Sequence, residues 1–258
     1  MSKKSDRRPK PKQPWKRKEP AAESPALAGR DPRYLAIAPA VDPPVVVHVA
    51  AVVPMGDRLV MFGVPAPSAL CLSIAHRAWK RSEDALRREL FAANIQTEPK
   101  DPGAVFDVLE DRLENIVFSY TAIELFANVA LPEDYTHRKE RDDGRCTEEY
   151  SRAQVERSFN LKTKLDAVLP GVRGVQSPKG TLLWERLAAL EKLRDRVVHL
   201  KWADVRRASP TNDTIWRELI ATVHEDYSVT AHDVISHFCM DGNRQRWIER
   251  FPYPARRP

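Results

Sequence analysis

Apolar residues recur every three or four positions through most of the chain after residue 67, which is the period of an amphipathic helix. This pattern predicts four long helices and two shorter ones, over 68–94, 102–130, 147–171, 182–199, 214–223 and 230–240. Asp101-Pro102 is a typical helix start, because proline fits the first helical turn. The polar stretch His137–Gly144 is expected to form a mobile loop. The pattern therefore predicts a mainly α protein whose helical domain covers residues 67–250.

Residues 34–66 have a different pattern. Six valines lie between Val45 and Val53, and β-branched runs favour strands. Pro54-Met55-Gly56-Asp57 is a turn signal, and a second apolar run, Leu59–Val64, follows it. We therefore predict a short N-terminal β-hairpin, which could pack on the helical body or on a partner. The prolines after residue 251 predict a C-terminal extension, 251–258, without further regular structure.

The net charge of +6 comes from the N-terminus rather than from the body of the protein. Residues 1–30 contain ten Lys/Arg and only three Asp/Glu, and several prolines lie among them. A segment of this kind cannot bury enough surface to fold, so residues 1–33 are expected to form a disordered basic, proline-rich tail. The tail is either a solubilising extension or a non-specific binder of nucleic-acid phosphates. Its candidate binding residues are Lys3, Lys4, Arg7, Arg8, Lys16, Arg17 and Lys18.

Composition excludes several classes of protein. With 258 residues, the chain can form one large domain or two small ones, and no apolar run is long enough to cross a membrane. Three widely spaced cysteines and the lack of a secretory signal predict a cytoplasmic protein without disulfides. The glycine-rich motifs that hold phosphates are absent, and the spacing of His232, His237 and Cys239 fits no structural zinc site. We therefore expect neither a cofactor nor a metal.

The segment Leu193–Lys201 carries the most informative chemistry, because it places charged and titratable groups at the end of a helix. Asp195 and His199 are four residues apart and face each other on a helix, where the carboxylate would orient the imidazole. Arg194 and His199 are five apart and point about 140° away from each other on a regular helix. They converge only if the helix ends near His199 or if another element shares the site.

These groups suit metal-independent RNA cleavage. Attack of a 2′-hydroxyl on the adjacent phosphate needs a proton acceptor, and histidine titrates in the right range. The phosphorane that forms needs nearby positive charge, and arginine can contact two phosphate oxygens at once. We therefore name His199 as the proton shuttle, Arg194 as the phosphate clamp and Asp195 as the group that orients His199.

The order Arg-Asp-x3-His at a helix end, within a largely helical region, resembles the signature of the HEPN superfamily. This resemblance covers about residues 68–240 and implies a HEPN-like helical bundle that cleaves RNA as a homodimer, with two motifs facing each other. It also implies a toxin or phage-defence effector, with an antitoxin or a nucleotidyltransferase as partner. In that family a polar residue of an earlier helix faces the motif. Glu124 and Asn128, from the segment Ser119–Asn128, are the candidates here, and Lys201 is a further supporting residue.

Three alternatives remain open. Arg194 could pair with Asp195 or Glu191 on the surface, while His199 satisfies helix-terminal carbonyls. Arg217 and His224 satisfy a looser form of the motif, but Glu218 follows that arginine. HEPN-like domains also serve as non-catalytic modules for dimerisation, nucleotide binding or partner binding.

Overall fold

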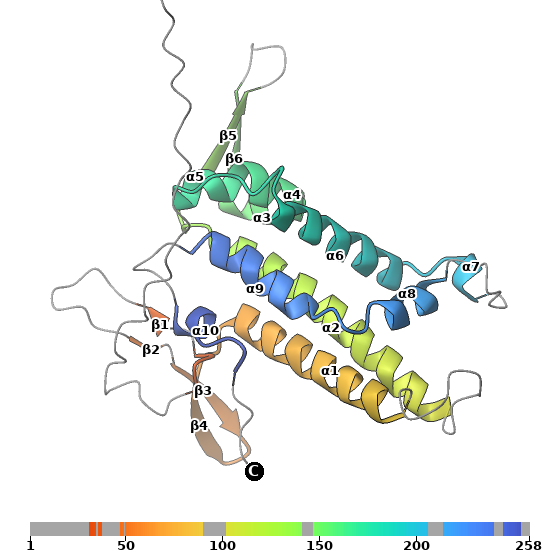
Figure 1. Cartoon of the computed structure of the whole chain (residues 1–258). Coiled ribbons are helices and arrows are strands. Elements are labelled where there is room, and N and C mark those ends of the chain that lie inside the picture. The colour runs from red at the N-terminus through yellow and green to blue at the C-terminus, as the bar shows by residue number, and fades with distance from the viewer. Residues whose placement is uncertain are drawn as a thin grey trace, which may run out of the picture. The chain divides into compact units, whose positions relative to one another are not determined.

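The computed structural model describes residues 31–34, 36–37, 47–48, 50–89, 102–140, 147–205, 214–239 and 245–253. The part of the chain that it describes is mainly helical, as predicted (Figure 1). The proposed basic tail, from Lys3 to Lys18, lies outside the described residues. Among the described residues, no helix has the length and apolarity needed to cross a bilayer.

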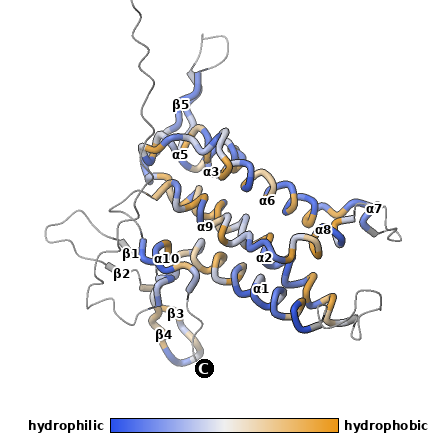
Figure 2. Tube along the Cα trace, in the orientation of Figure 1, coloured by the Kyte–Doolittle hydropathy of each residue, from blue (hydrophilic) through white to orange (hydrophobic). Residues whose placement is uncertain are grey.

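The main body is a bundle of helices around α2. Its helices are α1 (Pro67–Glu89), α2 (Pro102–Val129), α6 (Leu182–Val198), α8 (Ile215–Ala221) and α9 (Tyr227–His237). Helices α1 and α2 run antiparallel, because Asn115 contacts Ala75 while Asp111 contacts Arg81. Each of these five helices lies within, or within a few residues of, a helix that the apolar spacing predicts. Figure 2 shows hydrophobic and hydrophilic positions alternating along them.

Small residues allow α1 to lie close to α2. Ala75, Ala78 and Ser82 are all fully buried, and their spacings of three and four put them on one side of α1. Helix α2 lies at the centre and is buried on more than one side, because it packs against α1, α6, α8 and α9. Ile116 and Ile123, two turns apart, are both fully buried in its core face. Central packing of this kind explains why α2 matches its predicted bounds so closely.

The region 136–173 differs from the prediction. Strands β5 (Thr136–Glu140) and β6 (Thr147–Ser151) form an antiparallel pair, so the expected loop was wrong over His137–Glu140 and the expected helix start at Thr147 was wrong as well. The rest of the expected loop, 141–144, lies outside the described residues. The pairing joins two polar segments through cross-strand contacts, such as Arg138 Nε to Glu149 Oε1 at 2.8 Å. A hydrophobic pattern could not reveal this pairing, because the strands are joined by backbone hydrogen bonds and most of their side chains are polar and exposed.

The single helix expected up to residue 171 is broken into pieces. They are α3 (Arg152–Ser158), α4 (Leu161–Thr163), a π-helical turn (Lys164–Val168) and α5 (Leu169–Arg173). The break lies at Phe159, whose backbone is extended, and the next residue, Asn160, caps a new helix by accepting a hydrogen bond from the Thr163 N–H at 2.8 Å. Asparagine competes with helical backbone bonds in this way, so it ends one helix and starts another.

The predicted hairpin is present. Strand β3 (Ala50–Met55) pairs with β4 (Arg58–Gly63), and Gly56 takes the positive φ of 65° that the turn requires. Two shorter strands, β1 (Ala36–Ile37) and β2 (Val47–His48), form a separate antiparallel pair. The hairpin contacts the rest of the protein near its base, where Gly63 leaves room for the ring of Tyr34.

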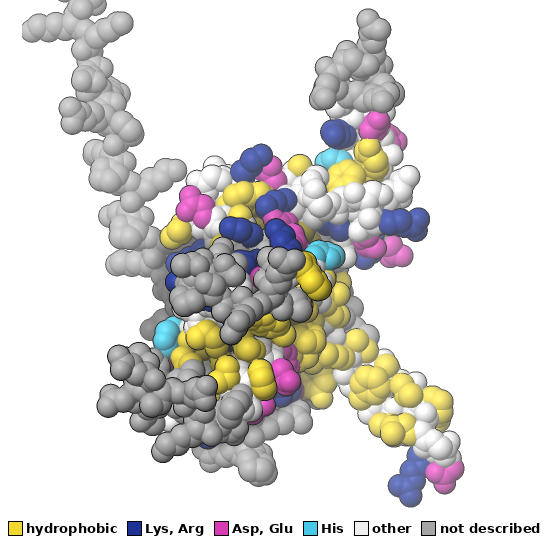
Figure 3. All heavy atoms as spheres, turned by 90° about the vertical axis from the view of Figure 1, so that its right-hand side faces the viewer, with side chains coloured by type: hydrophobic (Ala, Val, Ile, Leu, Met, Phe, Trp, Pro, Cys, Tyr) yellow, Lys and Arg dark blue, Asp and Glu magenta, His cyan; other side chains and the backbone are white. Residues whose placement is uncertain are grey.

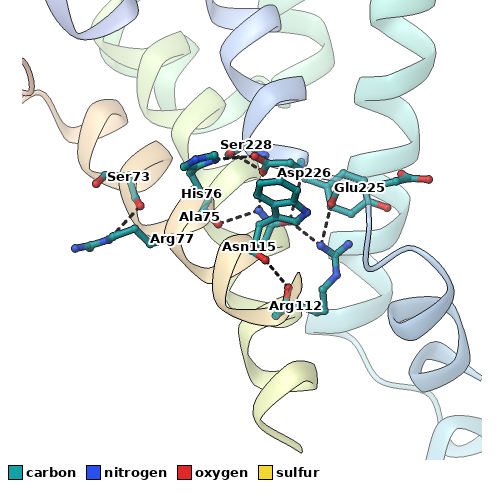
Figure 4. A network of polar contacts seen from close by, with 12 residues as sticks. Ser73, Ala75, His76, Arg77, Arg112, Asn115, Glu225, Asp226 and Ser228 are labelled. Carbon is teal, nitrogen blue, oxygen red and sulfur yellow. Dashed lines mark hydrogen bonds and ion pairs between the residues drawn. The ribbon is translucent and has the colours of Figure 1, made fainter. Parts of the chain in front are cut away.

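A buried polar network joins α1, α2 and the turn before α9 (Figure 4). Arg112 is fully buried, and its guanidinium donates to the carbonyls of Thr222 at 2.8 Å and Glu225 at 2.9 Å. Thr222 ends α8, so Arg112 satisfies a carbonyl at a helix terminus. Asn115, also fully buried, donates to the Ala75 carbonyl and to Asp226, the residue that caps α9.

The C-terminal segment has more structure than predicted. A short helix, α10 (Arg246–Glu249), ends just before the expected extension, and Phe251 and Tyr253 pack against the core. The ring of Phe251 stacks on His232 with centroids 4.9 Å apart, and His232 Nε2 lies 2.8 Å from the Ile248 carbonyl. These contacts hold the chain against the bundle up to Tyr253. The sequence analysis had predicted an extension without regular structure from residue 251 onward.

Candidate functional site

A polar cavity of about 560 Å³ opens between α2, α6 and the segment from α3 to the π-helical turn. Helix α2 contributes a row of residues with a spacing of four, Tyr120, Glu124 and Asn128, which therefore share one face. Helix α6 contributes Arg194 and Asp195 from its last turns. Further lining residues are Thr121, Leu125, Glu156, Arg157, Phe159, Asn160, Leu161, Lys164 and Glu191.

Arg194 is held by three neighbours in this cavity. Its guanidinium carbon lies 3.9 Å above the centre of the Tyr120 ring, Nη2 donates to Glu124 Oε1 at 3.3 Å, and Nη1 donates to Asp195 Oδ1 at 2.8 Å. A planar cation can stack on a ring and bond to two carboxylates at once, which the ammonium of lysine cannot reproduce. The side chain is only 23% exposed, so its orientation is well defined.

Two of the cations that line the cavity, Arg194 and Lys164, act on Glu124. Burial raises the pKa of its carboxyl, while Arg194 and Lys164 oppose that rise. Tyr120 donates its hydroxyl hydrogen bond to Glu191 Oε1 at 3.3 Å, and burial raises the pKa of this phenol. The tyrosine therefore stays neutral and offers Arg194 an aromatic face.

Lys164 is a site residue that the sequence analysis missed. It begins the π-helical turn and is only 6% exposed, and its Nζ donates to Asn128 Oδ1 at 2.7 Å and to the Glu156 carbonyl at 2.8 Å. Burial lowers the pKa of this amine. Lys164 lies three residues after Leu161 and four before Val168, so it occupies a position on the apolar face of the predicted helix. A lysine at such a position was the sequence signal that could have identified it as a buried cation.

His199 and Lys201 do not lie in the cavity. Helix α6 ends at Val198, and His199 is its exposed C-terminal cap, with its backbone N–H donating to the Asp195 carbonyl at 2.9 Å. Lys201 is exposed as well. The side chain of Asp195 bonds to Arg194 and not to His199 within the described part of the chain, contrary to the expected pairing of Asp195 and His199. Helix α6 does end next to His199, but His199 still does not line the cavity that holds Arg194.

The structure thus brings together four of the six residues predicted for the site: Arg194, Asp195, Glu124 and Asn128. The looser motif, Arg217 and His224, lies away from this cavity, and both of its residues are exposed. No group of three His, Cys, Asp or Glu side chains within the described ranges is arranged to hold a metal ion.

No protein-family model, curated protein or solved structure matches this chain.

Asp204 fixes the chain just after the exposed His199. Its buried carboxylate accepts hydrogen bonds from the backbone N–H groups of Ile215, at 2.8 Å, and Lys201, at 3.2 Å, and from Arg196. The Ile215 bond is the largest of the causes that lower the pKa of Asp204. A single carboxylate therefore ties the end of α6 to the start of α8.

We expect this carboxylate to make stability depend on pH. A lowered folded pKa means that Asp204 stabilises the fold above the ordinary Asp pKa of about 4, and that this contribution is lost as the pH falls below it. Asp204→Asn should lower the melting temperature at pH 7, and its difference from wild type should shrink in acid. Thermal unfolding monitored by circular dichroism measures both proteins. A difference in melting temperature that stays constant from neutral to acidic pH would contradict this role.

Proposed function

We propose that this protein is a metal-independent endoribonuclease of the HEPN kind that acts as a homodimer. The observation that carries the proposal is the convergence of Arg194, Glu124 and Asn128 in one polar cavity that includes the last turns of α6, the helix that the exposed His199 caps. Four carboxylates and three cations line the cavity, so the positive charge for a phosphate comes from Arg194 once a carboxylate partner turns away. The exposed imidazole of His199 can exchange protons with solvent and substrate. The proposed setting is a toxin or phage-defence effector with an antitoxin or a nucleotidyltransferase as partner.

In the proposed reaction, His199 takes the proton of an RNA 2′-hydroxyl as its oxygen bonds to the adjacent phosphorus. The bond from phosphorus to the 5′ oxygen breaks, and the imidazolium returns the proton to that oxygen. The products are a 2′,3′-cyclic phosphate and a free 5′-hydroxyl, so atoms and charge balance. Arg194 would neutralise the non-bridging oxygens in the transition state, where developing charge is greatest.

Arg194 must release one partner to contact a phosphate. Its two carboxylate partners are similarly exposed, 53% for Asp195 and 45% for Glu124, so either of them can turn toward water. The Tyr120 ring, 3.9 Å below the guanidinium carbon, keeps its stacking contact in both cases. A phosphate can therefore replace one carboxylate without displacing the arginine from the cavity.

A second copy is needed to complete the proposed site. His199 lies outside the cavity that holds Arg194 in its own chain, so one chain does not present both groups to one phosphate. Two copies related by a two-fold axis would give each phosphate an arginine cavity and an imidazole. This is the reason for proposing a homodimer.

The test is RNA cleavage by the full chain in EDTA. Wild type should cleave single-stranded RNA and leave cyclic phosphate ends, and His199→Ala should cleave no more than buffer alone. His224→Ala is the matched control, because His224 is also exposed but belongs to the looser motif. The proposal fails if purified wild type does not cleave RNA, or if His199→Ala cleaves as fast as His224→Ala.

A non-catalytic module is the second candidate. It is favoured by one observation: both terminal nitrogens of Arg194 already bond to carboxylates, Asp195 and Glu124, and its face stacks on Tyr120. The cavity would then bind a nucleotide or a partner without cleaving RNA. This function would be favoured if wild type binds a nucleotide but does not cleave RNA, and if Arg194→Ala no longer binds the nucleotide.

A further inference from the structure

The break between α3 and α4, residues 157–160, borders the cavity that holds Arg194 and is named the cavity rim. Three of its residues line the cavity: Arg157 in the last turn of α3, Phe159 at the break, and Asn160, which caps α4. Arg157 and Asn160 are exposed, so a ligand that enters the cavity can contact both of them.

Arg157 is an exposed cation of this cavity that no carboxylate neutralises. The four lining carboxylates all have cationic partners, which are Arg194 for Glu124 and Asp195, Arg152 for Glu156, and Lys162 for Glu191. Within the described part of the chain, the Arg157 side chain makes neither an ion pair nor a hydrogen bond. Figure 3 shows this mixing of charges, with Lys/Arg and Asp/Glu side chains close together over the upper part of the face that it draws.

Charge at the cavity therefore favours an anion once these partners are included. Arg152 and Lys162 bond to lining carboxylates from outside the cavity, and with them the site has five cations and four carboxylates. The positive charge that is accessible and unpaired belongs to Arg157. An anion can bind to this guanidinium without first breaking an ion pair, whereas Arg194 must release a carboxylate.

Asn160 adds a second donor to the rim. Its Oδ1 accepts the hydrogen bond from the Thr163 N–H at 2.8 Å, so the amide NH₂ is the part of the side chain left to bind a ligand. Among the described residues, this NH₂ group has no acceptor. A guanidinium and an amide NH₂ three residues apart offer several N–H groups to one anion, and phosphate oxygens commonly accept such bonds.

The rim is held in place from two sides. The ring of Phe159 makes edge-to-face contacts with the rings of His137 in β5 and Tyr150 in β6, with centroids 5.3 and 5.0 Å apart. From the other side, the buried Lys164 donates to the Glu156 carbonyl in α3 at 2.8 Å. Because the backbone of the rim is fixed before a ligand arrives, binding requires little further ordering.

We propose that Arg157 and Asn160 bind a backbone phosphate of single-stranded RNA, near the phosphate that Arg194 contacts. The inference rests on the proposed function for the identity of its ligand, and it assigns a contact away from the reacting atoms. The cavity volume of about 560 Å³ lies within the range of about 300–1,000 Å³ that is usual for ligand sites. The two rim residues therefore contribute to the affinity for RNA rather than to the chemical step.

The test measures binding of the full chain to a short labelled RNA in which every 2′-hydroxyl is methylated, so that 2′ attack cannot cleave it. Arg157→Ala should weaken binding about tenfold, as expected for a hydrogen bond between charged groups. It should also lower the slope of log affinity against log salt by about 0.7, the contribution of one phosphate contact on a single strand. Fluorescence anisotropy at several salt concentrations measures both effects.

Arg58→Ala is the matched control for the loss of one positive charge. Arg58, at the start of β4, is also exposed and has no side-chain partner in the described part of the chain, but it does not line the cavity. This variant should bind the methylated strand as wild type does. Asn160→Asp tests the second donor, because aspartate caps a helix as well as asparagine but repels a phosphate. It should weaken binding severalfold while the melting temperature stays near that of wild type.

Binding and cleavage can fail separately in this test. If Arg157→Ala binds the methylated strand as tightly as Arg58→Ala, or if wild type does not bind it, the proposed contact is wrong even if wild type cleaves RNA. If wild type binds the strand through Arg157 but leaves unmodified RNA intact, the contact is supported and the nuclease function is contradicted. Binding of adenosine monophosphate as tight as that of the strand, and lost in Arg157→Ala, would overturn the proposal in favour of a free nucleotide.

Discussion

Replacing Arg112 with methionine is expected to lower the free energy of unfolding by about 3 kcal/mol. The guanidinium is fully buried and donates to the carbonyls of Thr222 and Glu225 and to Asn115 Oδ1, at 2.8, 2.9 and 3.3 Å. Methionine fills similar space but donates no hydrogen bond. The Glu225 carbonyl then loses its arginine donor, whereas the Thr222 carbonyl keeps the N–H of Glu225 at 2.9 Å and Asn115 Oδ1 keeps the N–H of Tyr227 at 3.4 Å. Each buried acceptor that loses its donor costs about 1–3 kcal/mol.

A part of that loss is offset. Burial lowers the pKa of Arg112, which means that holding the guanidinium away from water already costs free energy, and methionine removes that cost. The guanidinium also lies 5.3 Å from the centre of the Tyr227 ring, and this contact is lost. The expected loss of about 3 kcal/mol therefore combines one acceptor left without its donor, two acceptors that each lose one of two donors, and the lost ring contact, less the cost of burying the charge.

Urea unfolding followed by circular dichroism measures this effect, with Arg81→Met as the control. Arg81 also bonds to carboxylates, Asp111 and Glu114, but its side chain is 53% exposed, so its loss should cost less than about 1 kcal/mol. If Arg112→Met is as stable as Arg81→Met, the buried network does not hold α8 and α9 to α2 as described.

The sequence predicted the elements whose signal is local. Helices α1, α2 and α6 have apolar spacing along their whole length, and the hairpin turn has Gly56 where a positive φ is needed. The β5–β6 pair was missed because its contacts, such as Arg138 to Glu149, join polar residues eleven apart. Periodicity reports which face is apolar, but not which polar segments pair.

In the candidate site, too, some residues could be predicted from the sequence and others could not. Glu124, Asn128 and Arg194 could be grouped because a known signature links two helices, and the structure places them in one cavity. Lys164 and Arg112 could not be assigned in advance, since each is a cation on an otherwise apolar face whose partners lie far along the chain. A buried charge is recognised only when the acceptors that surround it are known.

Substituting Arg194 with alanine is expected to reduce RNA cleavage by about 100- to 1,000-fold, the usual effect of removing one group that stabilises transition-state charge. Arg194→Lys should restore little of this activity. Its ammonium keeps the charge, but it cannot stack 3.9 Å above the Tyr120 ring while also reaching Glu124 and a phosphate. Rates of cleavage of a labelled RNA, with substrate in excess, measure both variants.

Arg186→Ala is the control on the same helix, because Arg186 is 53% exposed and its nearest carboxylate, Asp233, is 3.9 Å away. It should cleave RNA at the wild-type rate.

The lysine variant separates two roles for Arg194. If charge alone were needed, lysine would restore most of the rate, and the contacts with Tyr120 and Glu124 would only stabilise the fold. If the fork of the guanidinium is needed, lysine fails while its melting temperature stays near that of wild type, because the half-exposed Glu124 is readily solvated. The second result is the one that the geometry of this cavity predicts.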